Sequence, residues 1–217
     1  MIKDRLDIIP KVEEEDMKLL QSIEYQMKNH KWVPISSIIN NSNFTPQDAE
    51  YRIGRVGKFE LVDREQLAEE SYRLNRKGYD LLAIKELARK KSLDSLSNSK
   101  IGVGKEADVY SGIRGKGHVA VKIYRIGRTS FTTVKLKRRG FGGDKQNWLY
   151  LSKLTASREF EALKKLYPEV DVPKPIDQNR HILVTEVIEG VQMDDLKAID
   201  TEIAEKAFEN VIKNINY

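Results

Sequence analysis

The chain has 217 residues and a formal net charge of +5, with 40% hydrophobic and 33% charged residues, a balance that excludes a disordered or fibrous protein. It contains no cysteine, which excludes disulfides and thiolate zinc sites, and its three histidines are too scattered to predict a metal cluster. No apolar run approaches the roughly 20 residues that span a bilayer, and the charged N-terminus does not resemble a secretory signal, so we expect a cytoplasmic protein without membrane contacts.

The first ninety residues predict short helices followed by a β-ribbon. Apolar side chains recur at helical spacing over 12–27, and Thr45 followed by Pro46 has the pattern of a helix N-cap. The predicted elements are a helix over 12–27, a short helix after Pro34, a helix after Thr45, extended stretches at 59–62 and 71–74, and a helix over 78–90. This order is typical of a winged helix-turn-helix domain.

The pattern changes after residue 90. Residues 91–100 hold four serines and one asparagine, and we interpret them as a polar connector between two domains. Beyond it we expect alternating strands over 101–123 with turns at 111–112 and 115–117, a basic stretch over 125–147, a helix over 148–166, a buried strand at 182–184, and a helix from about Thr201.

Positive charge is concentrated in the middle of the chain. Residues 91–147 carry 13 basic and 4 acidic side chains, whereas residues 1–90 carry 16 of each. A solvated segment that faces an anion explains this distribution, and an accidental excess of exposed lysine is the alternative.

One glycine-containing segment and one lysine together suggest a site for phosphates. The segment over 102–109 lies between two predicted strands, where glycine lets the backbone approach a nucleotide closely, although Ala107 replaces the third glycine of the usual protein-kinase loop. Lys122 follows at the spacing of the next strand pair, and Glu159 on the helix over 148–166 is the best candidate for its carboxylate partner. Each feature alone could be a plain turn or a surface ion pair. In this order they favour kinase geometry.

The same residues resemble a known family. Four segments closely resemble the RIO family of atypical protein kinases: Gly102–Tyr110 (GVGKEADVY), Val121–Arg125 (VKIYR), Gly127–Phe131 (GRTSF) and Ser157–Leu166 (SREFEALKKL). The N-terminal pattern resembles the winged-helix-bearing subgroup of archaea and eukaryotes. The resemblance implies an α/β (α+β) fold with a winged helix (1–90), a connector (91–100), a kinase-like N-lobe (101–190) with a flexible loop (125–147) and hinge (184–190), and the start of a C-lobe (191–217).

The resemblance also implies an ATP-dependent serine/threonine kinase or ATPase that uses Mg²⁺. Lys122 and Glu159 would be the catalytic pair. The implied nucleotide contacts are Gly102, Gly104, Lys105, Val109, Ala120, Lys122, Ser130, Glu186 and Ile188. Ile101 would join Val109 and Ala120 around the base, and ordinary sheet core is the alternative for these three.

One departure from the family pattern bears on activity. Family members place a His-Gly-Asp catalytic loop after the helix that follows the hinge, and a metal-binding loop later. No histidine follows His181 here, and the sequence stops inside that helix. We therefore expect a truncated part of a longer kinase, inactive by itself and without metal ligands of its own.

The resemblance implies the small ribosomal subunit and its pre-rRNA as partners. Basic candidates for RNA contacts are Arg52, Arg55, Lys58, Lys135, Lys137, Arg138 and Arg139. Sequence-specific binding to duplex DNA is not expected, because the stretch between the two ribbon strands is acidic and residues 1–90 have no net charge. A non-catalytic rRNA-binding module with a vestigial nucleotide pocket remains the alternative function, and the winged helix as mere support for the kinase half is a further one.

Overall fold

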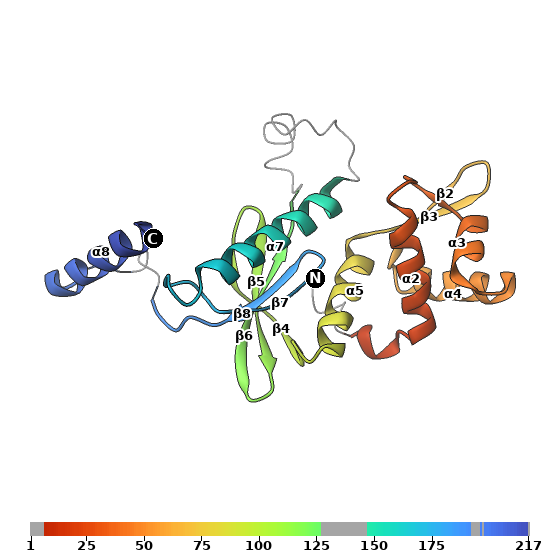
Figure 1. Ribbon diagram of the computed structural model, residues 1–217. Helices are drawn as coiled ribbons and strands as arrows, with labels where there is room; N and C mark the ends of the chain where they lie inside the picture. Colours follow the sequence, from red (N-terminus) through yellow and green to blue (C-terminus); the bar gives the residue numbers. More distant parts are fainter. Residues whose placement is uncertain (1–6, 127–146, 192–195, 197, 217) are drawn as a thin grey trace.

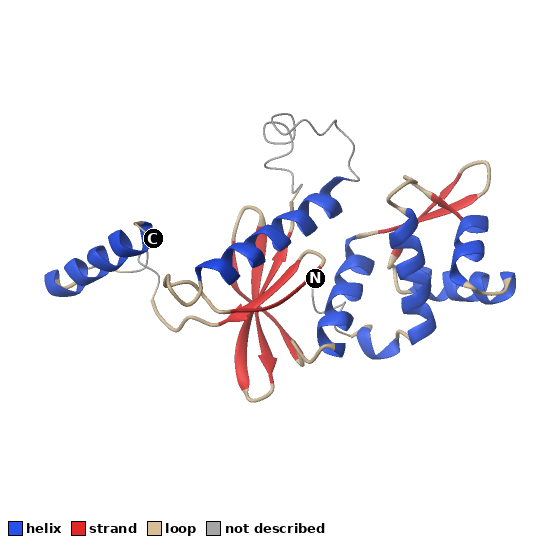
Figure 2. Ribbon diagram, in the orientation of Figure 1, coloured by secondary structure: helices blue, strands red, loops and turns tan. Residues whose placement is uncertain are grey.

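The computed structural model describes residues 7–126, 147–191, 196 and 198–216. Figure 1 shows a helical unit at one end, an antiparallel sheet in the middle and a separate helix at the other end. Figure 2 shows the same division, with the strands of the central sheet in red between the helical unit and the separate C-terminal helix.

The first unit has the predicted winged-helix order. Its elements are η1 (Ile9–Lys11), α2 (Glu14–Gln26), β1 (Val33–Pro34), α3 (Ile35–Ser42), α4 (Pro46–Lys58), β2 (Val62–Gln66), β3 (Glu70–Leu74) and α5 (Arg76–Arg89). The strands form an antiparallel sheet in the order β1-β3-β2. The helices bury a common apolar core that includes Leu19, Ile38 and Val56.

Local capping explains where these helices begin. The Thr45 hydroxyl oxygen accepts a 3.2 Å hydrogen bond from the Asp48 amide, which confirms the predicted start of α4. Asn75 caps α5 by accepting from the amides of Lys77 and Gly78, at 2.9 and 3.1 Å. Each cap satisfies backbone donors that the first turn of a helix leaves without partners.

The second unit is built on a five-stranded sheet. Its elements are β4 (Ser95–Val103), β5 (Ala107–Arg114), β6 (Gly117–Tyr124), α7 (Asn147–Leu166), β7 (Pro175–Asn179), β8 (Ile182–Glu186) and α8 (Thr201–Ile215). All neighbouring strands are antiparallel, in the order β4-β5-β6-β8-β7. With the winged helix, this arrangement confirms the predicted α+β class.

The sheet lies between α5 and α7 (Figure 1). Successive residues of a strand point to opposite faces. Val121 and Ile123 of β6 pack in one core with Ala83 and Leu87 of α5. On the other face, Tyr124 packs in a core with side chains of α7. The last helix of the first unit is therefore also part of the second unit's core.

The structure corrects several predicted boundaries. Residues 95–100, expected as connector, form the first part of β4, and the turn expected at 111–112 lies inside β5. Gly112 is needed there for close packing, because a Cβ atom would lie 2.7 Å from Leu93 Cδ1 and 3.0 Å from the Ser95 carbonyl oxygen. The extended stretch was expected at 59–62, but Phe59 is the C-cap of α4 and the strand β2 begins only at Val62.

Two further elements of the second unit, β7 and α8, differ in how well the sequence predicted them. β7 was not predicted, because its proline and polar residues give no alternating apolar pattern; it is an edge strand, where proline is tolerated. α8 begins at Thr201 as predicted, and its described residues include none that is buried. Across the parts of the chain that the structure describes, we find no helix with the length and apolar character needed to cross a bilayer.

Candidate functional site

Lys122 and Glu159 form the centre of the candidate site. The Nζ atom of Lys122 on β6 lies 2.8 and 2.9 Å from the two carboxylate oxygens of Glu159 on α7. The side chains are 35% and 33% exposed, so a ligand can reach the pair. The structure thus brings together two residues that the sequence predicted to meet across 37 positions.

Tyr124 is a third member that sequence reasoning missed. Its hydroxyl donates to Glu159, and its ring lies 5.2 Å from Lys122 Nζ. Burial, together with the adjacent Glu159 carboxylate, raises the pKa of the Tyr124 phenol well above its usual value, so it remains a neutral donor. The sequence contained a signal for Tyr124, because it lies two residues after Lys122 on the same strand, and such residues share a face.

The predicted glycine-containing loop is the turn between β4 and β5. The Gly104 amide donates to the Ala107 carbonyl at 2.8 Å, which closes the turn, and Lys105 lies between them. Ala107 is buried in a core with Tyr124 and α7, and this packing accounts for a methyl group where most kinases have glycine.

The residues predicted to contact nucleotide on the sheet share the face of Lys122. In antiparallel strands, residues directly opposite each other lie on the same face. Gly102 is opposite Val109, Val109 is opposite Lys122, and Ala120 is two residues before Lys122 and opposite Thr185. This face is continuous with the turn described above.

The predicted hinge over 184–190 begins inside β8 and continues beyond its end at Glu186. The Glu186 amide donates to the Lys174 carbonyl at 3.0 Å, and its own carbonyl accepts from the Thr185 hydroxyl at 3.0 Å. Ile188 is 65% exposed and Ile101 is 49% exposed, so both could cover a ligand. Ser130, Lys135, Lys137, Arg138 and Arg139 lie outside the described residues.

Phosphates fit this site better than a metal held by the protein alone. An ammonium group such as that of Lys122, and backbone amides such as those of a glycine-containing turn, are groups that bind phosphates in proteins. Among the residues that the structure describes, no group of three or more His, Asp or Glu side chains could hold a metal ion.

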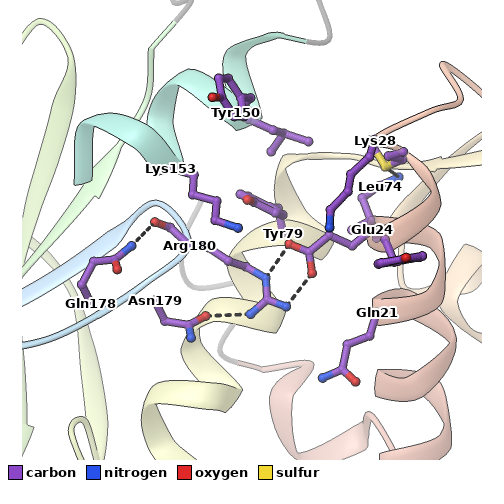
Figure 3. Close-up of a pocket in the computed structure, with 13 residues that line it drawn as sticks. Gln21, Glu24, Lys28, Leu74, Tyr79, Tyr150, Lys153, Gln178, Asn179 and Arg180 are labelled. Atoms are coloured by element: carbon purple, nitrogen blue, oxygen red, sulfur yellow. Dashed lines mark hydrogen bonds and ion pairs between the residues drawn. The ribbon is translucent and has the colours of Figure 1, made fainter. Parts of the chain in front are cut away.

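A cavity lies elsewhere, at the boundary of the two units (Figure 3). It has a volume of about 750 Å³ and is lined by α2, by the start of α7 and by the β7–β8 turn. Lys122 and Glu159 do not line it. Arg180 at its edge forms hydrogen bonds of 2.8 and 2.5 Å to the two carboxylate oxygens of Glu24.

Two of the predicted RNA-binding residues have partners inside the protein. Arg52 and Arg55 both bind Asp16 of α2, with shortest N–O distances of 3.1 Å for each, and both also pair with Glu13. Burial would raise the pKa of Asp16, but hydrogen bonds from Arg55, the Glu13 amide and Arg52 outweigh burial and lower it. These arginines join α4 to α2, whereas Lys58 is exposed at the end of α4.

Comparison with known proteins identifies the family. Residues 9–90 match the model described as Rio2, N-terminal, and residues 108–217 match the RIO domain. This chain belongs to the Rio2 kinase family. The resemblance predicted from the GVGKEADVY and GRTSF segments is thereby confirmed.

The curated Rio2 relatives are longer than this chain. It is 41% identical over 177 residues to the RIO-type serine/threonine-protein kinase Rio2 of Methanocaldococcus jannaschii, covering 80% of this chain and 63% of the relative. It is 36% identical over 189 residues to serine/threonine-protein kinase RIO2 of Saccharomyces cerevisiae, covering 84% and 44%. The chain therefore spans about half the length of these relatives.

Two solved Rio2 structures from Chaetomium thermophilum have the same fold. A complex described as Rio2 kinase with ADP/Mg²⁺ and phosphoaspartate matches with a TM-score of 0.82 and 30% identity, covering 95% of this chain and 62% of that one. A second Rio2 kinase structure matches with a TM-score of 0.78 and 32% identity, covering 91% and 58%.

Proposed function

We propose that this chain is the nucleotide-binding part of a RIO-type serine/threonine kinase or ATPase, and that it binds MgATP at Lys122. The observation that carries the proposal is the contact of Lys122 with both oxygens of Glu159, beside a glycine-containing turn. The ADP/Mg²⁺ complex of the Chaetomium thermophilum Rio2 kinase supports the same class of ligand.

The hydrogen-bonding groups at Lys122 suit a phosphate ligand. An ammonium group has three N–H donors, and Glu159 engages Nζ with two oxygens, which leaves a donor for a phosphate oxygen. Tyr124 donates to the same carboxylate and helps to hold it in place. Gly102 and Gly104 would let backbone amides approach the remaining phosphate oxygens.

The base would lie between the sheet face and the hinge. Val109 and Ala120 are half-buried on the face of Lys122 and would contact the ring. Because the Glu186 amide already donates to Lys174, we propose the Glu186 carbonyl and the Ile188 amide as the partners of adenine. The Mg²⁺ ligands and the catalytic aspartate would come from polypeptide outside these 217 residues.

Binding of MgADP tests the proposal. Lys122→Ala should weaken binding at least about tenfold, because a hydrogen bond to a charged group contributes about 1.5–3 kcal/mol. Lys116→Ala removes the same charge from the exposed β5–β6 turn and should leave the affinity unchanged. Titration calorimetry on the chain and both variants measures this. Equal affinity for the chain and Lys122→Ala, or no binding by the chain itself, would contradict the proposal.

We further propose that the whole protein acts in the cytoplasm in maturation of the small ribosomal subunit, in contact with its pre-rRNA. The excess of positive charge over 91–147 supports an anionic partner. RNA affinity that falls steeply with salt, in a chain that binds no MgADP, would favour the non-catalytic RNA-binding module instead.

A further inference from the structure

A buried charged cluster joins the winged helix to the sheet. Asp80 of α5 accepts hydrogen bonds of 2.6 and 2.8 Å from the two terminal nitrogens of Arg125, just after β6. His181, just before β8, lies with Nε2 at 2.6 Å from the same carboxylate. All three side chains are 4% exposed or less. The cluster therefore links three segments from both units and is buried from solvent.

This cluster fixes geometry more than it adds stability. Burying an arginine and a carboxylate costs desolvation that their attraction offsets only in part. A two-pronged arginine–carboxylate contact, however, fixes the guanidinium plane and hence the side chain's position. His181 is also restricted, because its ring stacks on Tyr79 at 4.9 Å between centroids.

The backbone of Arg125 continues this contact to the proposed phosphate loop. Its amide donates to the Glu106 carbonyl at 2.6 Å, and Glu106 lies in the turn that the Gly104–Ala107 hydrogen bond closes. The preceding amide, of Tyr124, donates to the His181 carbonyl at 3.0 Å. Arg125, just after β6, is thus bound through its side chain to Asp80 of α5 and through its backbone amide to the turn over 104–107.

We propose that Asp80 is a positioning residue: from the winged helix it fixes Arg125, and through the Arg125 backbone it sets the conformation of the turn over 104–107. The winged helix would then control how the turn meets phosphates. This consequence for nucleotide binding rests on the proposed function, whereas the control of the turn does not.

A purely structural role for Asp80 predicts a different pattern. If Asp80 only joined the two units, its loss would destabilise the interface as a whole. A second ion pair joins the same two units without using Asp80, because Arg180 pairs with Glu24 of α2 (Figure 3). Local loosening of the turn, with the rest of the protein unchanged, is therefore the distinctive sign of a positioning role.

Amide hydrogen exchange of the 217-residue chain, followed by NMR, tests the proposal. Asp80→Asn keeps the shape of the side chain but removes its charge. We expect exchange at the Arg125 and Gly104 amides to rise at least tenfold, with amides of α2 and α4 unchanged and MgADP affinity reduced about tenfold. Glu86→Gln is the matched control, because it breaks an exposed acid–arginine pair on the same helix, to Arg89. It should leave all of these values unchanged.

Wild-type exchange at Gly104 in a folded Asp80→Asn variant would overturn the proposal. If that variant exchanges rapidly throughout, Arg125→Lys decides, because it keeps the buried charges but loses the two-pronged contact. Faster exchange confined to the turn over 104–107 then supports the positioning role, and an unchanged turn overturns it. If the wild-type chain binds no MgADP, the proposed function fails, and the exchange measurement still decides the role of Asp80.

Discussion

Two helical glycines of the first unit have opposite surroundings. At Gly78 in α5, a Cβ atom would lie 2.2 Å from the Leu61 carbonyl oxygen and 3.2 Å from Leu74 Cδ2. At Gly54 in α4, no heavy atom lies within 4 Å of the corresponding position. Because helix propensity penalises both glycines equally, tertiary packing decides what each position tolerates.

We expect Gly78→Ala to lower the free energy of unfolding by at least about 1–3 kcal/mol, since a backbone carbonyl cannot move aside as a flexible side chain can. Gly54→Ala should raise it by up to about 0.8–1.0 kcal/mol, the difference in helix propensity between glycine and alanine. Urea denaturation of both variants measures the two changes. Wild-type stability of Gly78→Ala would show that α5 and Leu61 are less closely packed than described.

The predictability of single residues depended on where their partners lie. Lys122 and Glu159 could be predicted because a glycine-containing loop, a strand lysine and a helix acid occur in a recognisable order. The prediction of RNA contacts for Arg52 and Arg55 rests on their charge, and their ion pairs with Asp16 and Glu13 could not be predicted from the sequence. The burial of Asp16, 36 positions before Arg52, arises only when α2 packs on α4.

At the scale of elements, locally encoded features were predictable and long-range ones were not. Caps gave the start of α4, and apolar periodicity gave α7 and β8, because these signals lie within a few residues of one another. β4 was placed too late because its first residues, serine-rich and polar, resemble a connector. They become a strand by pairing with β5, and a local pattern does not contain that pairing.

α2 depends on one buried carboxylate at its first turn. Asp16 is fully buried and accepts a 3.0 Å hydrogen bond from the Glu13 amide, which forms a reciprocal cap. It also receives Arg52 and Arg55 of α4. The Asp16 side chain therefore caps the start of α2 and also binds α4.

We expect Asp16→Ala to lower the free energy of unfolding by about 2–4 kcal/mol, because it removes a cap and leaves two guanidinium groups without this partner. Glu14→Ala is the matched control, since it removes an exposed acid from the same turn and should change stability by less than about 0.5 kcal/mol. Thermal and urea denaturation test the difference. Equal stability of the two variants would contradict the role assigned to the contacts of Asp16 with Arg52 and Arg55.

For the molecule as a whole, the match to the Rio2 N-terminal model ends at residue 90, but two hydrophobic cores contain side chains from both sides of that residue. α5 contributes Ala83, Ile84 and Leu87 to the core of the five-stranded sheet. In return, Trp148 and Leu149 at the start of α7 pack with the core of the winged helix. We infer that the two units share their stability, so a group buried between them influences the unfolding of both.

His181 is such a group, because its side chain is fully buried beside Asp80 of α5. Burial lowers its pKa below the ordinary value of 6.5, although the adjacent Asp80 carboxylate opposes this shift. The unfolded chain therefore takes up a proton at pH values where the folded protein does not. Stability is then lost as the pH falls below about 6.5. The pKa of Asp80 is lowered from 3.8, mainly by Arg125 acting against burial, so its contribution is lost only at more acidic pH.

We expect the free energy of unfolding to fall between pH 7 and pH 5, with a contribution from His181 of up to about 1.4 kcal/mol per pH unit. His181→Gln should remove this contribution, because an amide can still donate to Asp80 but does not titrate. His118→Gln, at an exposed position, should keep the wild-type decline. Urea denaturation at several pH values compares the three proteins. The assignment to His181 fails if His181→Gln loses as much stability as the wild type, because the proton uptake must then occur elsewhere.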